Sequence, residues 1–461
     1  MEKITVPVAG IFLMILAFVR ASSKWSVSHH QQKPGSRMGS PAGCRKPPHS
    51  LLSWCLTFLL LFSSVSVQAD ITFPERRKNQ FPDSPAHLVV PLPYSYPGIG
   101  SGYFLMGNFS NVLETTDILA MYVTGDARGY ILQFDEVPIV SKRLFVKYFY
   151  QDINKAQINQ YDVRGMAGTS KNEFTLLDVS LARNKVADLN LTFFDRRLNF
   201  LYQRIENEFG VKAIRDYQGI LISALDYHGK ETKNAFGVAV DLTDDYLDPL
   251  KGIAFNLEYQ NQPKSTANDP SFYVLTYNMS LYTPMFEADT LVLNYFQSDA
   301  HVTSPGNTNP ADIRNELGFN CNPLDTGCLQ SEQKLVDGFI NMRTNGTSAS
   351  LGGKDRLRSY PQGRFNGGHT AFLGVEYRLN FKQEVKPFDY LFWKDVRTGL
   401  QVAFFGEVGS VSENSGDLWK QNRSSYGVGL RLVAASGAVY RADIANGVEG
   451  SELTMMFAYP W

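Results

Sequence analysis

An alternation of apolar and polar residues near position 375 constrains this chain more than any other feature. The apolar positions are Leu373, Val375, Tyr377, Leu379 and Phe381, and the positions between them are Gly374, Glu376, Arg378 and Asn380. Successive side chains of a strand point to opposite faces of its sheet, so this run predicts a strand with one apolar and one charged face. A charged face needs water or partner charges. The pattern therefore indicates a barrel wall with lipid outside and a polar interior.

The segment directly before this strand cannot form a regular element. It contains Pro361, which lacks a backbone donor, and several glycines, which leave the backbone free. Its glycines are Gly352, Gly353, Gly363, Gly367 and Gly368. We therefore predict a loop that carries cations and leads into a wall strand.

Composition narrows the class of protein. The 461 residues carry a net charge of -1 and 13% aromatic residues. A near-neutral chain lacks the basic surface that a nucleic-acid partner requires. The mean hydropathy of -0.20 is too low for a bundle of membrane helices, and no mature segment approaches the ~20 apolar residues of a membrane helix. Alternating barrel strands give such a profile.

The N-terminus has the composition of a targeting signal. An apolar stretch at 51–67 follows Arg45 and Lys46 and ends before Asp70. A basic segment, an apolar segment and a small final residue predict a signal peptide at 38–69. We interpret residues 1–37 as an upstream extension from a mis-assigned start. A membrane anchor is the alternative, although no basic stop-transfer flank follows.

Three groups of residues resemble one known family. Leu357-Arg358-Ser359-Tyr360 with Gly363-Arg364-Phe365 looks like the arginine-bearing loop motif of the outer-membrane assembly-factor superfamily. This family is also called bacterial surface antigen and includes BamA-like and TamA-like barrels. Phe405-Gly406-Glu407-Val408-Gly409 is similar to its FxDxG strand motif, and 427–431 with 441–443 is similar to its last strands. Ser359 replaces the family's glycine and Glu407 its aspartate.

The resemblance implies an all-β fold, a sixteen-stranded antiparallel transmembrane β-barrel at 101–461, with an inward-folded loop before strand 12. Our count of alternating runs also gives sixteen, with Gly219–Tyr227 and Ala235–Leu242 as separate strands. We interpret 70–100 as a short periplasmic N-terminal segment. It is too short for the periplasmic POTRA modules of BamA-like proteins, so we expect a short member that lacks them.

The same resemblance implies a latch between Arg358 and Glu407 inside the barrel. Alternation places Glu376 and Glu407 on the interior faces of adjacent strands, and a guanidinium offers a planar fork to such carboxylates. The expected loop motif consists of Gly352, Gly353, Leu357, Tyr360, Gly363, Arg364 and Phe365. Further interior charges are expected at Arg378, Arg431, Arg441 and Asp443. The alternative is that all these charges are solvated pore residues.

A long insertion at 298–350 precedes the arginine motif, and we expect it over the extracellular barrel mouth. Asn309 and Pro310 predict the start of one helix, and a second is expected at about 332–342. Cys321 and Cys328, the two cysteines left after the leader, predict a disulfide in an exported protein. A metal site is the alternative, but no histidine lies nearby in the sequence.

The last residues alternate up to the C-terminus. Phe457, Tyr459 and Trp461 lie in a strand expected at Glu452–Trp461. They resemble the C-terminal aromatic signal by which outer-membrane barrels are recognised by their assembly machinery. Pro460 departs from usual strand composition, but a proline is tolerated at a strand end.

The sequence offers no strong catalytic motif. The histidines are scattered, and no His-Glu-x-x-His, P-loop or Gly-x-Ser-x-Gly pattern occurs. We therefore expect no enzyme activity, cofactor or metal, although a Ser/His/Asp site assembled from distant strands stays open. By fold-level analogy we expect protein insertion or translocation at the outer membrane of a Gram-negative bacterium. A passive channel or a surface-structural protein is the alternative.

The expected partners follow from that placement. They are outer-membrane lipid and lipopolysaccharide, the barrel assembly machinery during biogenesis, and an unfolded client protein in the case of a translocase.

Overall fold

A computed structural model describes residues 85–112, 116–168, 170–246, 248–286, 289–319, 321–383, 388–391, 393–396, 398–434 and 439–461. The predicted signal peptide and the upstream extension lie outside the described residues.

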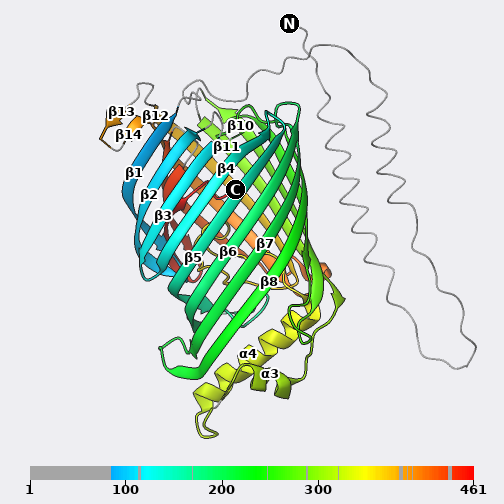
Figure 1. Cartoon of the computed structure of the whole chain (residues 1–461). Coiled ribbons are helices and arrows are strands. Elements are labelled where there is room, and N and C mark those ends of the chain that lie inside the picture. The colour runs from blue at the N-terminus through cyan, green and yellow to red at the C-terminus, as the bar shows by residue number, and fades with distance from the viewer. Residues whose placement is uncertain are drawn as a thin grey trace, which may run out of the picture. The chain divides into compact units, whose positions relative to one another are not determined.

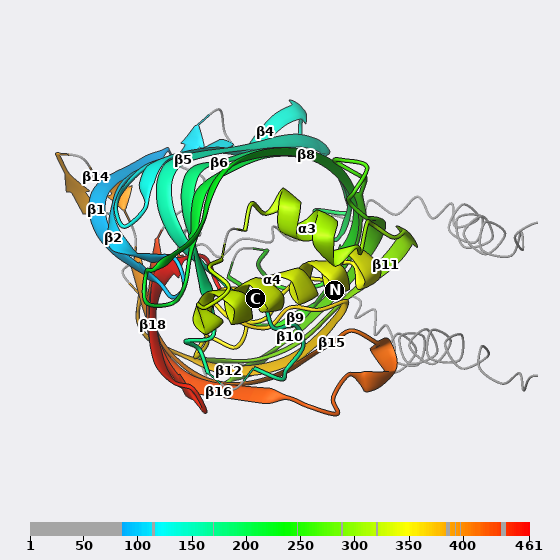
Figure 2. The same ribbon diagram turned by 90° about the horizontal axis from the view of Figure 1, so that it is seen from below.

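In the described part of the chain, sixteen antiparallel strands form the wall of a closed barrel. Figure 1 shows the barrel from the side and Figure 2 along its axis. The wall strands are β1 (Ala86–Tyr96), β2 (Gly100–Val112), β3 (Thr116–Gly125), β4 (Arg128–Val140), β5 (Leu144–Gln160), β6 (Thr175–Phe193), β7 (Leu198–Arg215), β8 (Leu221–Asp241), β9 (Gly252–Gln262), β10 (Ser271–Met285), β11 (Asp289–Ser304), β12 (His369–Gln383), β15 (Thr398–Ser412), β16 (Arg423–Ala434), β17 (Val439–Gly447) and β18 (Gly450–Phe457). The predicted sixteen-stranded antiparallel barrel is confirmed. Two short strands, β13 (Phe388–Tyr390) and β14 (Trp393–Val396), form an additional hairpin.

Two of our strand assignments are wrong, and their errors cancel in the count. The first strand, β1, lies within the 70–100 segment that we expected to precede the barrel. Its prolines, Pro91 and Pro93, obscured the strand pattern, but proline is compatible with a strand that has one sparsely paired edge. The two strands expected at 219–227 and 235–242 are one 21-residue strand, β8. The residues between the two expected strands are mostly polar, and in the sequence they resemble a turn.

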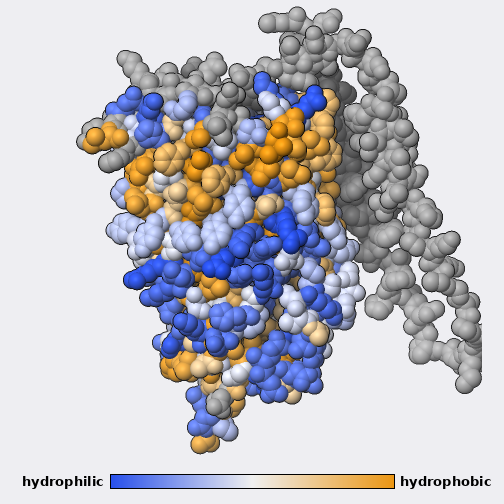
Figure 3. Space-filling model, in the orientation of Figure 1, coloured by the Kyte–Doolittle hydropathy of each residue, from blue (hydrophilic) through white to orange (hydrophobic). Residues whose placement is uncertain are grey.

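The wall alternates as expected from the pattern near position 375. Val375, Phe404 and Val428 point outward and are 41%, 51% and 42% exposed, whereas Glu376 and Arg431 on the opposite faces are fully buried. On the face that Figure 3 shows, apolar residues gather in a band near the end of the barrel that lies away from the helices, and polar residues predominate between that band and the helices. An outward apolar band of this kind is what a lipid-facing barrel presents.

The two ends of the barrel differ. The turns at the end where β1 begins are mostly short, as between β6 and β7 (194–197). The connections at the other end include 161–174 and the insertion between β11 and β12. That insertion carries α3 (Pro310–Glu316), capped by the Asn309 side chain as predicted, and α4 (Thr326–Asn345), which begins earlier than expected. Figure 2 shows both helices across the mouth of the barrel. Neither described helix is long and apolar enough to cross a membrane.

The seam between the first and last strands is sparsely paired. Within the described residues, β1 pairs with β18 at one position, Ser95 with Met455. The Ser95 hydroxyl donates to the Leu453 carbonyl (2.9 Å), and the Tyr440 hydroxyl donates to the Pro93 carbonyl (2.6 Å). Near the start of β1, the same edge of the strand pairs with β14 instead of β18, through His87 with Lys394 and Leu88 with Trp393. The wall is therefore closed by far fewer hydrogen bonds at this seam than elsewhere.

Candidate functional site

The segment before β12 folds back on itself and forms a compact loop. We call residues Leu351–Phe365 the latch segment. Its two ends exchange backbone hydrogen bonds, Leu351 N to Phe365 O (2.9 Å) and Phe365 N to Leu351 O (3.0 Å). Gly352 and Gly353 adopt φ values of +98° and +106°, a backbone conformation that side-chain-bearing residues avoid. The glycines that the motif contains are therefore needed to turn the chain here.

Arg358 lies at the centre of the site and contacts carboxylates from three strands. Its Nε donates to Glu407 Oε1 (2.8 Å), Nη1 to Asp443 Oδ2 (2.8 Å) and Nη2 to Glu376 Oε2 (3.2 Å). These partners belong to β15, β17 and β12, and all four side chains have no exposed surface. One guanidinium thus joins a loop to three wall strands.

Two further contacts fix the position of Arg358. Its backbone N–H donates to Glu407 Oε2 (2.8 Å), so Glu407 holds the residue through both main chain and side chain. The guanidinium carbon lies 3.3 Å from the centroid of the Phe405 ring. Charge-assisted hydrogen bonds together with an aromatic face give the guanidinium a defined orientation.

The other predicted interior charges belong to the same network. Glu376 also accepts from Arg378 Nε (2.8 Å) and from Arg431 Nη1 (2.6 Å), and Arg441 pairs with Asp443. The network therefore contains four arginines and three carboxylates, and all seven side chains are buried. Asp355, 3.9 Å from Arg441, adds a fourth carboxylate at its border. Every charge taken out of water here has an opposite charge beside it, as burial of ions requires.

Inward-facing glycines make room for the latch segment. A Cβ added at Gly409 would lie within 3 Å of Leu351, and one at Gly447 would collide with the Ser359 hydroxyl. At Gly427 an added Cβ would lie 2.5 Å from the Phe405 ring. We did not predict this shared role for the three glycines, although each of them falls at an inward position of its strand in the alternating pattern.

The remaining loop-motif residues anchor the latch segment by apolar contacts and one ion pair. Leu357, Tyr360 and Phe365 are fully buried and pack in one cluster with Phe372 and Val411. Arg364 forms a two-pronged ion pair with Glu449 in the β17–β18 turn, at 2.8 Å and 2.9 Å. Gly363 has φ +68° and no neighbour at the Cβ position. It therefore serves the turn and makes no contact of its own.

The latch segment also reaches the opposite side of the seam. The Gln362 backbone N–H donates to the Pro97 carbonyl (2.9 Å), and the Tyr96 hydroxyl donates to Gln362 Oε1 (2.7 Å). Pro97 lies in the turn between β1 and β2. One loop therefore contacts wall strands on both sides of the sparsely paired seam.

The C-terminal residues are not where the sequence placed them. The last strand, β18, ends at Phe457, and Ala458 has φ +71°. The chain then turns away from the strand, and the Tyr459 hydroxyl donates to Asp248 Oδ1 (2.7 Å), with Gln401 Oε1 3.2 Å away as an alternative acceptor. Its ring lies 4.1 Å from the Arg378 guanidinium carbon. The strand expected at Glu452–Trp461 is therefore wrong at its end, because alternation in sequence cannot show where a strand leaves the wall.

Trp461 ends beside the latch segment rather than in the last strand. Its ring packs edge-on against Phe372, with centroids 6.3 Å apart, and the Arg358 guanidinium carbon lies 5.9 Å from it. A Cβ added at Gly374 would lie 2.7 Å from this ring. Of the three expected assembly-signal residues, only Phe457 lies in the strand.

The two cysteines lie apart from this network. Cys321 and Cys328 form a disulfide with Cα atoms 5.7 Å apart, and Cys328 belongs to the first turn of α4. The bond closes a short loop at the start of the helix. Among the described residues, no group of three or more His, Cys, Asp and Glu has the arrangement of a metal site.

Comparison with known proteins gives similarity at the level of the fold. No family model and no curated protein matches the chain. BamA from Haemophilus ducreyi lacking POTRA domains 1–3 has a TM-score of 0.44 and 12% identity, over 81% of this chain and 69% of that chain. CdiB from Escherichia coli has a TM-score of 0.46 and 12% identity, over 82% of this chain and 62% of that chain.

Proposed function

We propose that this chain is an outer-membrane barrel of a Gram-negative bacterium that assists the insertion or translocation of other proteins. The outward apolar band supports a position in a membrane, where only fully hydrogen-bonded structures such as closed barrels can span. Short turns at one end and longer connections at the other are typical of outer-membrane barrels, with the longer ones extracellular. In this proposal α3, α4 and the disulfide lie on the extracellular side.

The seam between β1 and β18 is the observation that carries the proposal. A passive pore requires a continuous wall, and each backbone hydrogen bond in that wall resists separation of the strands. Here one residue pair joins the first strand to the last. The edge of β1 also contains Pro91 and Pro93, which have no N–H to donate. A wall that separates easily at one seam suits lateral release or pairing of a client strand.

The Arg358 network complements a weak seam. It fastens β12, β15 and β17 to one another through the latch segment, at a distance of one strand or more from the seam. Strands joined by buried ion pairs keep their relative positions, because separating the partners leaves uncompensated charges. Opening at the seam can then proceed while this side of the wall stays intact.

A disulfide across the seam tests the function. In a Cys321→Ser, Cys328→Ser background, Ser95→Cys with Met455→Cys places two thiols at the one paired position. Oxidation should abolish assembly of an unfolded outer-membrane client in reconstituted vesicles, and reduction should restore it. The matched control is Ile444→Cys with Leu453→Cys, which joins the fully paired strands β17 and β18 and should leave assembly unchanged.

Conductance in planar bilayers separates this function from a passive channel. A translocase should crosslink to the client and show conductance that changes when the seam is bridged. Steady conductance that neither disulfide alters, together with no client crosslink, would overturn the proposal in favour of a channel.

A further inference from the structure

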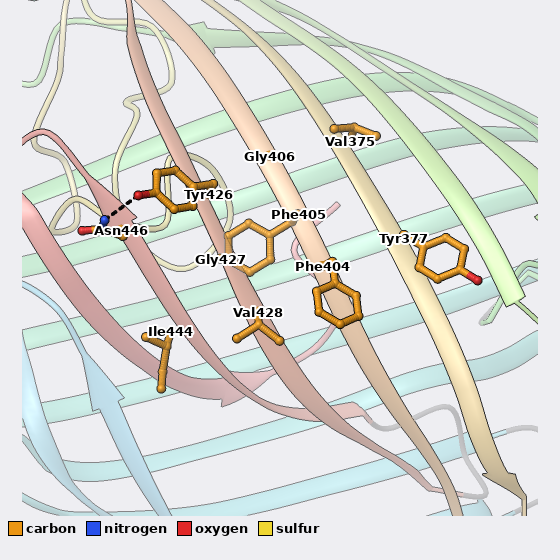
Figure 4. A pocket seen from close by; sticks show the side chains of 10 residues that line it. All are labelled: Val375, Tyr377, Phe404, Phe405, Gly406, Tyr426, Gly427, Val428, Ile444 and Asn446. Carbon is orange, nitrogen blue, oxygen red and sulfur yellow. Dashed lines mark hydrogen bonds between the residues drawn. The ribbon is translucent and has the colours of Figure 1, made fainter.

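The outer surface of the barrel has a depression directly behind the Arg358 network. It measures about 500 Å³ and lies between β12, β15, β16 and β17. Figure 4 shows the side chains around it. Apart from Asn446, the outward side chains that line it are apolar or aromatic. Three of them, Phe404, Tyr426 and Ile444, are 51%, 59% and 58% exposed.

The strand register explains why the depression exists. One outward row across the four strands reads Val375, Gly406, Tyr426 and Asn446. The next row reads Tyr377, Phe404, Val428 and Ile444. Gly406 is thus a missing side chain in an otherwise filled surface. A Cβ added there would meet one described neighbouring atom, Val375 Cγ1 at 3.6 Å, so the space is open.

Polar groups border the depression toward both ends of the barrel. Toward the helix-bearing end, Asn446 Nδ2 donates to the Tyr426 hydroxyl (2.7 Å), and the Ser451 hydroxyl donates to Asn446 Oδ1 (3.1 Å). Toward the other end, the Tyr377 hydroxyl donates to Asp289 Oδ2 (2.5 Å). Both tyrosine hydroxyls thus have a protein partner at the border, and the outward side chains between them offer an occupant mainly apolar contact. A sugar or a phosphate needs several hydrogen bonds, and this lining does not supply them.

We propose that this depression, called the groove below, is a binding site for one acyl chain of a membrane lipid. The groove continues the outward apolar surface of the wall, whose neighbour in a membrane is the hydrocarbon of lipid tails. A flexible acyl chain can enter the gap that the missing side chain at Gly406 leaves, whereas the flat surface of a partner protein would leave that gap empty. Filling it restores the dispersion contacts that the lining atoms lack. The site rests on the membrane position proposed above and adds a defined lipid contact to it.

The groove lies close to the Arg358 network, because β15 contributes Gly406 to the groove on its outer face and Phe405 to the network on its inner face. Phe405, next to Gly406, points inward and lies against the Arg358 guanidinium, and its ring packs over Gly427. An acyl chain in the groove contacts the outer face of the strand pair whose inner face holds the latch segment.

Photo-crosslinking tests the site in the folded full-length barrel. The protein is reconstituted into vesicles of phosphatidylcholine that contain an analogue with a diazirine at mid-chain, and labelled residues are mapped by mass spectrometry. Phe404 and Tyr426 should be labelled, and Gly406→Leu, which fills the groove, should lower their labelling several-fold. Labelling of Leu430 and Leu453, outward residues outside the groove, should not change. Val402→Leu, an outward change on the same strand beyond the groove, is the matched control.

The possible outcomes distinguish the acyl-chain site from the membrane position on which it rests. Labelling of Phe404 and Tyr426 that Gly406→Leu leaves unchanged would overturn the acyl-chain site alone. No labelling at any outward position would overturn the membrane position as well. A semi-native gel reports whether Gly406→Leu is folded. If it is not, Gly406→Ala, for which the structure has room, should give a smaller decrease of the same labelling.

Discussion

The two sides of the barrel interior are built on different chemistry. The inner faces of β12, β15, β16 and β17 carry the buried charges that hold Arg358 and the latch segment. The inner faces of β1 to β7 carry an apolar cluster that includes Phe104, Met121 and Val179, and Leu335 of α4 packs in the same cluster. Both sides hold a part of the β11–β12 insertion. One side holds it by oriented ion pairs in addition to apolar contacts, and the other mainly by burial of apolar surface.

The two kinds of contact contribute differently, one mainly to the stability of the protein and the other mainly to the position of the latch segment. Apolar burial is non-directional and stabilises at about 25 cal/mol per Å². A buried ion pair contributes little net stability, because desolvation offsets attraction, but losing one partner costs about 3–5 kcal/mol. We infer that the apolar side mainly stabilises the closed mouth, while the charged side fixes where the latch segment lies. The predictions below test this division.

The largest effect is expected at Arg358. Arg358→Ala leaves Glu407, Asp443 and Glu376 each without one partner, and should lower the free energy of unfolding by about 3–5 kcal/mol. Glu407→Ala should cost less, because Arg358 keeps its other two carboxylates. The double variant should cost less than the sum, with a coupling of about 1 kcal/mol or more. Urea unfolding gives the energies, and protease accessibility of Leu351–Phe365 reports the latch segment.

Lys354→Ala is the control for this series. Lys354 pairs with Asp355 at 2.8 Å, but both side chains are about one-third exposed, so its loss should cost about 0–1 kcal/mol. Strict additivity of Arg358→Ala and Glu407→Ala would contradict a shared network.

On the apolar side, Leu335→Ala should lower stability by about 2–4 kcal/mol, through lost burial and the cavity that remains. Leu335 is 1% exposed and lies in the apolar cluster, not in the one that contains the latch segment. Its effect should therefore add to that of Arg358→Ala within about 0.5 kcal/mol. Leu335→Met, which keeps the volume, should cost under about 1.5 kcal/mol. A large coupling between Leu335 and Arg358 would show that the two sides do not act independently.

A pH dependence is expected where α4 packs on the β5–β6 connection. A Cβ added at Gly338 of α4 would lie 2.9 Å from the Asp162 carbonyl oxygen, so helix and loop are in close contact. Burial raises the pKa of the Asp162 carboxyl to about 7, against the opposing effects of hydrogen bonds from Gln160 and Thr175 and of the Lys334 charge. The folded protein therefore keeps a proton that the unfolded chain releases near pH 4.

The sign follows from that difference. Stabilisation from protonated Asp162 is complete below about pH 4 and is lost as the pH rises to about 7. The protection factors of the α4 amides, which are exchange rates corrected for the intrinsic pH dependence of amide exchange, should therefore fall between about pH 4 and pH 7. In Asp162→Asn, which mimics the neutral carboxyl, this fall should disappear. An equal fall in both proteins would show that Asp162 does not cause it.

The smallest effect is expected at the disulfide. It closes a loop with a sequence separation of 7 at the tip of the insertion. The entropic gain from closing so short a loop is less than the ~3 kcal/mol of a 15-residue loop, and neither cysteine contacts the Arg358 network. Cys321→Ser with Cys328→Ser should leave the folded band in a semi-native gel unchanged. Loss of that band would mean that the insertion stabilises the wall itself.

Much of the wall was predictable because its signal is local. Leu373 to Phe381 alternate in sequence, and alternation alone decides which side chains share a face of a strand. The inward positions of Glu376 and Glu407 follow from the same rule. The strand β1 was missed because two prolines interrupt its pattern, and β8 was divided because its polar middle resembles a turn. The alternation of apolar and polar residues by itself reveals neither the strand β1 nor the continuity of β8.

The sequence by itself determined an alternating barrel wall and a glycine-rich arginine loop before one of its strands. Only the tertiary structure decided that Arg358 meets three carboxylates, since Glu376, Glu407 and Asp443 come together through the register of four neighbouring strands. It also decided that β1 and β18 share one residue pair and that Tyr459 and Trp461 leave the wall. Closure of a ring and the filling of its interior depend on residues far apart in the chain, and a local pattern does not record them.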